Sequence, residues 1–441
     1  MSTETPAIPK KSSERIFFPG LDGLRFIAAG LVILFHVEWK RSWFGHINYL
    51  DINFFHTVGY FGVTLFFVLS GFLITYLILK EQEKEKTVNV LHFYIRRVLR
   101  IWPLYFFIIL TGFFLWPNLP IFEIPGYSDL WEFLNWKTFI LYSVFLSSVV
   151  FVQYGNIPYL DQTWSVSVEE QFYLIWPILV KFFHKKLIRV LFFVILLLLI
   201  IKIALLFIYA YTANLYKVLT LVELSRFGCM ATGGIAAYVY FKNKTGILDF
   251  LLRRDLFWLT FVFILFLLIA GFSVLIVVPF LVAYAVLIYS WLRKTNPKIA
   301  GIPLIIIAIL ALVLTAHLSG NLNYPVFTKF QHEIISFPFA LVILQVSVKK
   351  EKFQLLQHAV MQYLGRISYG IYMYHNLMIT LSIRAMHEIM PNQDSFLAHM
   401  LNYLIAFLFA IICSAVSYKL LETPFLHMKK RFAKVKSGAK D

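Results

Sequence analysis

Long apolar runs recur along the chain and alternate with short polar segments. Twelve of these runs approach the roughly 20 apolar residues that a helix needs to cross a bilayer. They cover residues 22–39, 58–79, 98–116, 167–183, 188–209, 226–241, 256–271, 273–292, 300–317, 333–348, 364–386 and 398–421. Because lipid cannot satisfy backbone hydrogen bonds, such runs favour helices. The pattern predicts an all-α, polytopic transmembrane helical bundle of about 10–12 spans.

Lys and Arg indicate how these spans are oriented. If the N-terminus lies inside, the inner connecting segments hold 30 Lys and Arg and the outer segments hold 5. Such an excess is typical of cytoplasmic loops. We therefore expect both termini in the cytoplasm, with residues 1–16 as a disordered tail and 427–441 as a basic tail. Residues 17–426 are expected to form one membrane domain.

A further apolar run, residues 138–152, is too short for a simple span. The orientation above places the segments on both sides of it, 117–137 and 153–166, outside. We therefore expect 138–152 to dip into the membrane and return, or to lie on the outer surface. The alternative is that one of the other spans is miscounted.

The composition excludes several classes of protein. Of the 441 residues, 60% are hydrophobic and only 14% are charged, against about a quarter charged in soluble domains. The net charge of +17 does not indicate nucleic-acid binding, because the basic residues cluster in short loops between apolar runs. Both cysteines, Cys229 and Cys413, fall within apolar runs, so no disulfide is expected. The polar start has no small-residue cleavage site after the first span, and no removable signal peptide is expected.

The first apolar run carries two polar side chains on one helix face. Arg25 and His36 are eleven residues apart, and eleven steps of about 100° return a helix to within about 20° of its start, roughly 16 Å along its axis. Because both residues are costly in lipid, we expect them to face a protein interior. We interpret His36 as a reacting group and Arg25 as an anchor for an anion or a cofactor. The alternative is close helix packing, with His36 merely hydrogen-bonded inside the bundle.

Two adjacent carboxylates, Glu169 and Glu170, open a later apolar run in the segment Thr163–Tyr173. The helix macrodipole would stabilise a carboxylate at this position, and Ser165 could cap the helix. Two neighbouring Glu point about 100° apart, so at least one should face protein. In the expected topology both share the outer half of the membrane with His36, where a carboxylate could orient the imidazole.

Basic residues on the cytoplasmic side form a possible anion site. Arg97 and Arg100 are three residues apart and should face the same way on a helix, and guanidinium forks suit phosphate. The alternative is that they only satisfy the positive-inside rule. Two weaker candidates follow: His375 in mid-membrane, which could line the same cavity as His36, and Glu422, which could pair with a basic loop. Both residues could instead be structural.

Several motifs are absent from the sequence. There is no phosphate-binding GxxxxGK[ST] loop, no GxSxG serine elbow and no HExxH zinc motif. ATP-driven transport and serine-hydrolase chemistry therefore have no local support, and no metal site is expected.

Taken in order, these segments resemble the acyltransferase 3 family of integral membrane acyltransferases, over about residues 20–426. The matching segments are Leu21–His36 with its Arg-x10-His pattern, Gly62–Thr75, Phe93–Arg100 with its Arg-x-x-Arg pattern, Trp164–Tyr173, Ser368–His375 and Glu422–Pro424.

The resemblance implies a function. Members of that family transfer acyl groups, commonly acetyl, from cytoplasmic acyl-coenzyme A to hydroxyls of carbohydrate at or beyond the outer face. The family's essential first-helix histidine corresponds to His36 and the arginine before it to Arg25, and the Arg-x-x-Arg pair corresponds to Arg97 and Arg100. The expected partners are acyl-coenzyme A as co-substrate, with acetyl-coenzyme A as the expected form, a carbohydrate or glycolipid acceptor and the lipid bilayer, with no nucleic acid. The expected location is a bacterial plasma membrane, as a multi-pass protein.

The resulting hypothesis is an O-acyltransferase mechanism. The phosphates of acyl-coenzyme A meet Arg97, Arg100 and Arg25, the thioester reaches the level of His36, and this histidine acts as general base on a sugar hydroxyl, oriented by Glu169 or Glu170. An acyl-histidine intermediate is a variant of this scheme. The alternatives are a secondary transporter with an intramembrane proton relay of His, Glu and Arg, or a structural subunit of a glycan-export complex.

Overall fold

The computed structural model describes residues 15–126, 128–208, 213–242, 245–319, 326–390 and 392–435, and in these residues it contains helices and no β-strand. The α-helices are α1 (Pro19–Trp43), α2 (Asn53–Glu85), α3 (Val90–Phe114), α4 (Trp136–Ser143), α5 (Ser147–Tyr154), α6 (Thr163–Phe183), α7 (Leu187–Ile208), α8 (Ala213–Ser225), α9 (Phe227–Lys242), α10 (Thr245–Leu251), α11 (Arg254–Ala270), α12 (Val274–Thr295), α13 (Gly301–Leu318), α14 (Val326–Lys329), α15 (Gln331–Val348), α16 (Ala359–Arg366), α17 (Ser368–Ile389), α18 (Phe396–Ser417) and α19 (Thr423–Lys429). Short 3-10 turns lie at Trp116–Asn118, Pro120–Phe122, Ser128–Phe133, His184–Lys186, Pro297–Ile299, Lys350–Lys352, Leu355–Gln357 and Lys430–Phe432, and a π-turn lies at Tyr418–Glu422.

The predicted all-α bundle is confirmed. Each of the twelve predicted spans coincides with a helix, and 9 helical stretches of the described chain are long and apolar enough to cross a membrane by length and composition. The numbers differ for three reasons. Helices α6 and α7 are continuous through the turn at His184–Lys186 and form one stretch. The 17-residue helix α11 is shorter than the length used for a span, and the 22-residue helix α17 is not apolar enough.

Helix α1 is longer than its apolar run. It continues to Trp43, four residues past the predicted end at 39, and its last turns carry Lys40 and Arg41 into the protein interior, where both are fully buried. The sequence analysis assigned these two cations to an outer loop, because it ended the span where the apolar residues end. Glu38 is buried beside them and accepts a hydrogen bond from His399 Nε2 at 2.6 Å.

The short apolar run 138–152 forms a helical hairpin made of α4 and α5. Each helix has 8 residues, about 12 Å at 1.5 Å per residue, which is too short to cross a bilayer. The turn between them reaches into the bundle: the amide of Gln171 in α6 donates to the carbonyl of Phe145 at 2.8 Å, and the Tyr105 hydroxyl in α3 donates to the carbonyl of Tyr142 at 2.9 Å. The segment therefore enters the bundle and returns, as predicted.

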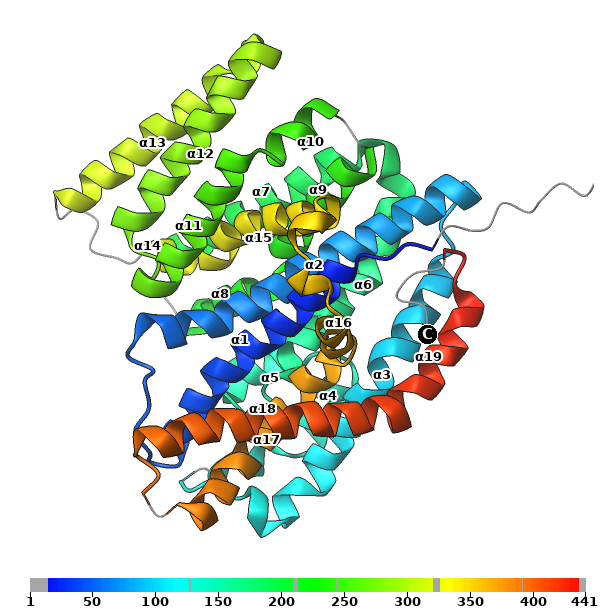
Figure 1. The fold of residues 1–441 in the computed structure, drawn as a ribbon, viewed down its shortest axis with the longest axis vertical. Coiled ribbons are helices and arrows are strands. Elements are labelled where there is room, and N and C mark those ends of the chain that lie inside the picture. The colour runs from blue at the N-terminus through cyan, green and yellow to red at the C-terminus, as the bar shows by residue number, and fades with distance from the viewer. Residues whose placement is uncertain are drawn as a thin grey trace, which may run out of the picture.

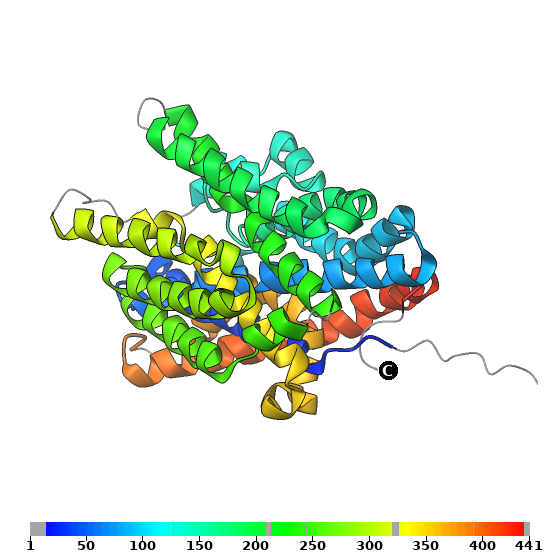
Figure 2. The ribbon, with the colours of Figure 1, turned by 90° about the horizontal axis from the view of Figure 1, so that it is seen from above.

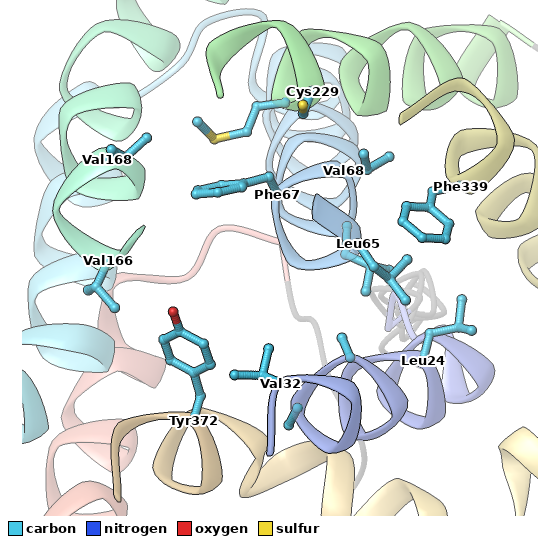
Figure 3. Close-up of a cluster of buried hydrophobic side chains, with 14 of the residues drawn as sticks. Leu24, Val32, Leu65, Phe67, Val68, Val166, Val168, Cys229, Phe339 and Tyr372 are labelled. Atoms are coloured by element: carbon cyan, nitrogen blue, oxygen red, sulfur yellow. The ribbon is translucent and has the colours of Figure 1, made fainter. Parts of the chain in front are cut away.

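The long helices α1 and α2 lie at the centre of the bundle (Figure 1). Figure 3 shows apolar side chains of six helices converging around them: Leu24 and Val32 of α1, Leu65, Phe67 and Val68 of α2, Val166 and Val168 of α6, Cys229 of α9, Phe339 of α15 and Tyr372 of α17. Helices α2 and α9 pack backbone to backbone, because a Cβ at Gly71 would overlap the Met230 carbonyl and one at Gly233 the Val68 carbonyl. Small residues at such a crossing bring two helices unusually close.

Helices α12 and α13 form the rim of the bundle. They project at one edge in both views (Figures 1 and 2), and most of their exposed side chains are apolar, as are those of α7. Apolar side chains that face outward on long helices are expected where the surrounding solvent is lipid. The rim helices therefore face outward, and the polar cavities described below are formed by the central helices.

The C-terminal helix α19 packs beside α3 (Figure 1). The guanidinium of Arg96 donates to the carbonyl of Phe432 at 2.8 Å, and Lys84 Nζ donates to the carbonyl of Lys434 at 2.9 Å. The described part of the predicted basic tail, up to residue 435, thus folds back onto α2 and α3. Residues 1–14 and 436–441, which the sequence analysis also assigned to tails, lie outside the described residues.

Candidate functional site

The bundle holds a cavity of about 110 Å³ lined by three arginines, which we name the arginine cavity. Arg25 reaches it from α1, and Arg97 and Arg100 reach it from α3. The prediction that Arg97 and Arg100 face the same way is therefore confirmed. Arg96 turns away from this cavity, because Glu81 pairs with its guanidinium at 2.8 Å.

The arginine cavity has an excess of positive charge. Arg25 pairs with Asp22 at 2.6 Å, but Arg97 and Arg100 form no ion pair among the residues that the structure describes. The Arg97 guanidinium stacks near the Tyr173 ring, 5.8 Å from its centroid, and its buried Nε has no hydrogen-bond partner in the described chain. Two unpaired guanidinium groups in one cavity are suited to a phosphate-bearing ligand.

The structure places Glu169 in the arginine cavity and Glu170 beside it. Glu169 lies in the electrostatic field of Arg25, Arg97 and Arg100, whereas Glu170 accepts a hydrogen bond from Trp102 Nε1 at 3.0 Å. Neither carboxylate lines the cavity that contains the predicted reacting histidine.

Two details of α6 explain this placement. The helix begins at Thr163, four residues before the predicted start, so both carboxylates lie well past its first turn. Ser165 does not cap the helix; its hydroxyl donates instead to the carbonyl of Gln162 at 3.1 Å and lies 2.6 Å from the Tyr372 hydroxyl. The expectation that Glu169 or Glu170 contacts His36 is wrong. It rested only on the similar depth of these residues in the membrane, whereas the rotation of α6 turns the two carboxylates toward α3.

The bundle also holds a larger cavity of about 510 Å³, which we name the histidine cavity. Its walls come from eight helices, from the loop before α6 and from the turn between α8 and α9. They include Phe35, His36, Trp39, His56, Tyr60, Val63, Asp161, Gln162, Trp164, Glu223, Arg226, Lys329, His332 and Tyr372. The two cavities have Val63 and Tyr372 in common. Arg25 and His36 therefore line two neighbouring cavities. We name the boundary that these cavities share, at Val63 and Tyr372, the junction.

His36 is held in one tautomer by its own helix. Its Nδ1 lies 2.9 Å from the carbonyl of Val32, and because a carbonyl can only accept, Nδ1 must carry the proton. Nε2 is then left with a free lone pair, as a general base requires. A backbone carbonyl therefore does the orienting that the sequence analysis assigned to a carboxylate.

A second histidine stands beside the first. The ring of His375 lies 4.6 Å from that of His36, centroid to centroid. Its Nδ1 bonds to the carbonyl of Tyr372, and its buried Nε2 has no partner among the described residues. The structure thus brings the weaker candidate His375 against the main one. Glu422, by contrast, forms no ion pair in the described chain, and the expected pairing with a basic loop is not found.

Sequence reasoning missed a buried polar group next to the two histidines. Asp161 accepts from Asn376 Nδ2 at 2.6 Å and from the Gln162 amide at 3.0 Å, while its second oxygen is buried without a partner in the described chain. Burial raises the pKa of the Asp161 carboxyl, and the nearby Lys40 ammonium opposes that shift. The sequence offered only an indirect signal for this group. Lys40 follows His36 by four residues and so shares its helix face, which indicates that a buried acidic partner should lie nearby.

Comparison with known proteins decides the family. The model of the acyltransferase domain family matches residues 18–419. The chain belongs to this acyltransferase family. The matched segment contains the residues that line both cavities, whereas Glu422 and helix α19 lie beyond its end.

Curated relatives match a smaller part of the chain. Peptidoglycan O-acetyltransferase OatA of Listeria monocytogenes is 31% identical over 178 residues, which is 39% of this chain and 25% of that protein. The putative peptidoglycan O-acetyltransferase YrhL of Bacillus subtilis is 30% identical over 173 residues, 38% of this chain and 24% of that protein. The chain therefore covers about a quarter of the length of these relatives. No solved structure matches it.

Proposed function

We propose that this protein is a multi-pass O-acyltransferase of a bacterial plasma membrane that transfers an acyl group, preferably acetyl, from cytoplasmic acyl-coenzyme A to a hydroxyl of a cell-envelope carbohydrate. The observation that carries the proposal is the pair of cavities that meet at Val63 and Tyr372. One has unpaired guanidinium groups, and the other has a histidine with a free Nε2. Family membership and the named O-acetyltransferase relatives support this reading.

The arginine cavity is the proposed donor site. Guanidinium groups of Arg97 and Arg100 would bind the phosphates of acyl-coenzyme A, because charge-assisted, forked hydrogen bonds favour phosphate. The excess of Lys and Arg in the segments predicted to lie inside supports a cytoplasmic position for this cavity. The thioester would then extend toward the junction and present its carbonyl to the histidine cavity.

The histidine cavity is the proposed site of transfer. His36 Nε2 accepts the proton of an acceptor hydroxyl while the hydroxyl oxygen attacks the thioester carbonyl. The tetrahedral intermediate collapses to the ester, and the coenzyme A thiolate leaves and recovers the proton from His36. In the acyl-histidine variant the same Nε2 attacks the thioester first and the hydroxyl attacks the acyl-imidazole in a second step.

The two donor-site arginines should affect the Michaelis constant for the donor. Replacing Arg97 or Arg100 with Gln removes a charge-assisted hydrogen bond and should raise KM for acetyl-coenzyme A by about ten-fold or more, with a smaller effect on KM for the acceptor. The measurement is ester formation by purified protein with acetyl-coenzyme A and an envelope glycan, followed by mass spectrometry.

Arg96 provides the matched control for this test. It lies on the same helix, but Glu81 holds its guanidinium away from the cavity, so Arg96→Gln should leave KM for acetyl-coenzyme A unchanged. An equal rise in all three variants would show that the basic cluster acts only through the general electrostatic field. Absence of ester with any glycan tested would contradict the proposed function itself.

A further inference from the structure

The histidine cavity is also lined by a buried cation, Arg226. This residue lies in the turn between α8 and α9, and only 8% of it is exposed. Its φ is +49°, in the left-handed region that residues other than glycine rarely adopt. Residues held in such conformations cluster at binding sites.

The carboxylates near Arg226 are already taken. Glu223 pairs with Lys329 at 3.6 Å, and Glu333 pairs with Lys202 at 3.0 Å. Arg226 itself forms no ion pair in the described part of the chain: one of its Nη atoms donates to the Glu223 carbonyl, and its buried Nε has no hydrogen-bond partner there. A buried guanidinium without a counter-ion is costly unless an anion joins it.

Neighbouring groups leave the charge of Arg226 unmatched. Lys329 and Glu223 also line the cavity, and these two residues pair with each other. Asp161 lines the cavity from the loop before α6, and its second carboxylate oxygen is buried without a partner in the described chain. An anionic ligand would therefore be attracted toward Arg226 and repelled from Asp161.

We propose that Arg226 binds an anionic group, a carboxylate or a phosphate, on the carbohydrate acceptor, and thereby presents a hydroxyl of that acceptor to His36. The acceptor is then an acidic glycan and not a neutral one. This inference rests on the proposed function and adds the substrate class. The planar fork of Arg matches carboxylate and phosphate oxygens in pairs, which a lysine cannot reproduce.

The test compares acceptors that differ in one group. Purified full-length protein is supplied with acetyl-coenzyme A and one of three glycans: a carboxylated oligosaccharide, the same oligosaccharide with its carboxyls reduced to alcohols, and the reduced form carrying a phosphate. Wild-type protein should show a KM at least about ten-fold lower for an anionic glycan than for the reduced one. The anion that gives the lower KM identifies the source of the charge.

Variants of Arg226 assign the preference to this residue. Arg226→Gln should abolish the difference in KM between anionic and reduced glycans by raising KM for the anionic glycan at least about ten-fold. Arg226→Lys should retain part of the difference. Arg253→Gln, at an exposed guanidinium that pairs with Asp255, is the control and should behave as wild type.

A binding measurement separates this inference from the function it rests on. Trp39 and Trp164 line the cavity, so their fluorescence should report glycan binding without turnover. Binding of an anionic glycan to wild type and its loss in Arg226→Gln support the inference even if no ester forms, an outcome that would contradict the proposed function alone. Equal affinity for anionic and reduced glycans, or an equal effect of Arg226→Gln on both, would overturn it.

Discussion

Replacing His36 with Ala is expected to lower acyl transfer by at least about 100-fold, the lower end of what a positioned general base contributes. The His36 imidazole lines the histidine cavity, its tautomer is fixed by a backbone carbonyl, and its Nε2 is available to accept the proton of an acceptor hydroxyl. The measurement is ester formation by purified protein, together with acetyl-coenzyme A binding, which should not change.

A matched control separates chemistry from folding. His427 is exposed near the C-terminus, so His427→Ala should retain full activity, and both variants should be inserted in the membrane in equal amounts. Transfer by His36→Ala at the wild-type rate would remove this histidine from the mechanism. If activity remains in His36→Ala but disappears in His375→Ala, the neighbouring imidazole is the base.

Filling the junction between the two cavities is expected to be the other severe change. Val63 lines both cavities, so Val63→Trp should separate the donor thioester from His36. Misplacement of reacting groups by about 1 Å can cost 100-fold in rate, and we expect a loss of at least that size. Coenzyme A binding, measured by calorimetry, should persist, because the guanidinium groups are unchanged.

Val286 supplies the control for the added bulk. It is 46% exposed on the rim helix α12, so Val286→Trp should leave transfer unaffected. Loss of coenzyme A binding in Val63→Trp would show that the donor occupies the junction itself. Normal transfer in Val63→Trp would mean that the acyl group follows another route.

The helices could be predicted from the sequence because each is an apolar run of the length that a bilayer requires. Their ends could not always be predicted. Helix α1 continues through Lys40 and Arg41, because Asp394 and the carbonyls of Ile47 and Gln393 receive the Arg41 guanidinium. The Lys40 ammonium lies over the Trp43 ring, 3.7 Å from its centroid. A span that ends on charges in the sequence can therefore continue where tertiary contacts satisfy them.

The candidate site was predicted in part. The shared face of Arg97 and Arg100 follows from helix geometry, and so does the alignment of Arg25 with His36. The positions of Glu169 and Glu170 depend on how α6 rotates against α3, which no local pattern specifies. In the sequence, Arg226 is one basic residue between two helices. Only the structure shows that its charge is unmatched, because the nearby carboxylates of Glu223 and Glu333 pair with lysines.

The central claim is that the donor and the acceptor enter the same protein from opposite sides of the membrane. The most direct measurement uses proteoliposomes that contain the purified protein in one orientation, with acetyl-coenzyme A on the side of the arginine cavity and the glycan on the other side. We expect ester on the glycan across the intact bilayer, and none when acetyl-coenzyme A is moved to the glycan side. Transfer that requires both substrates on the same side would contradict the account.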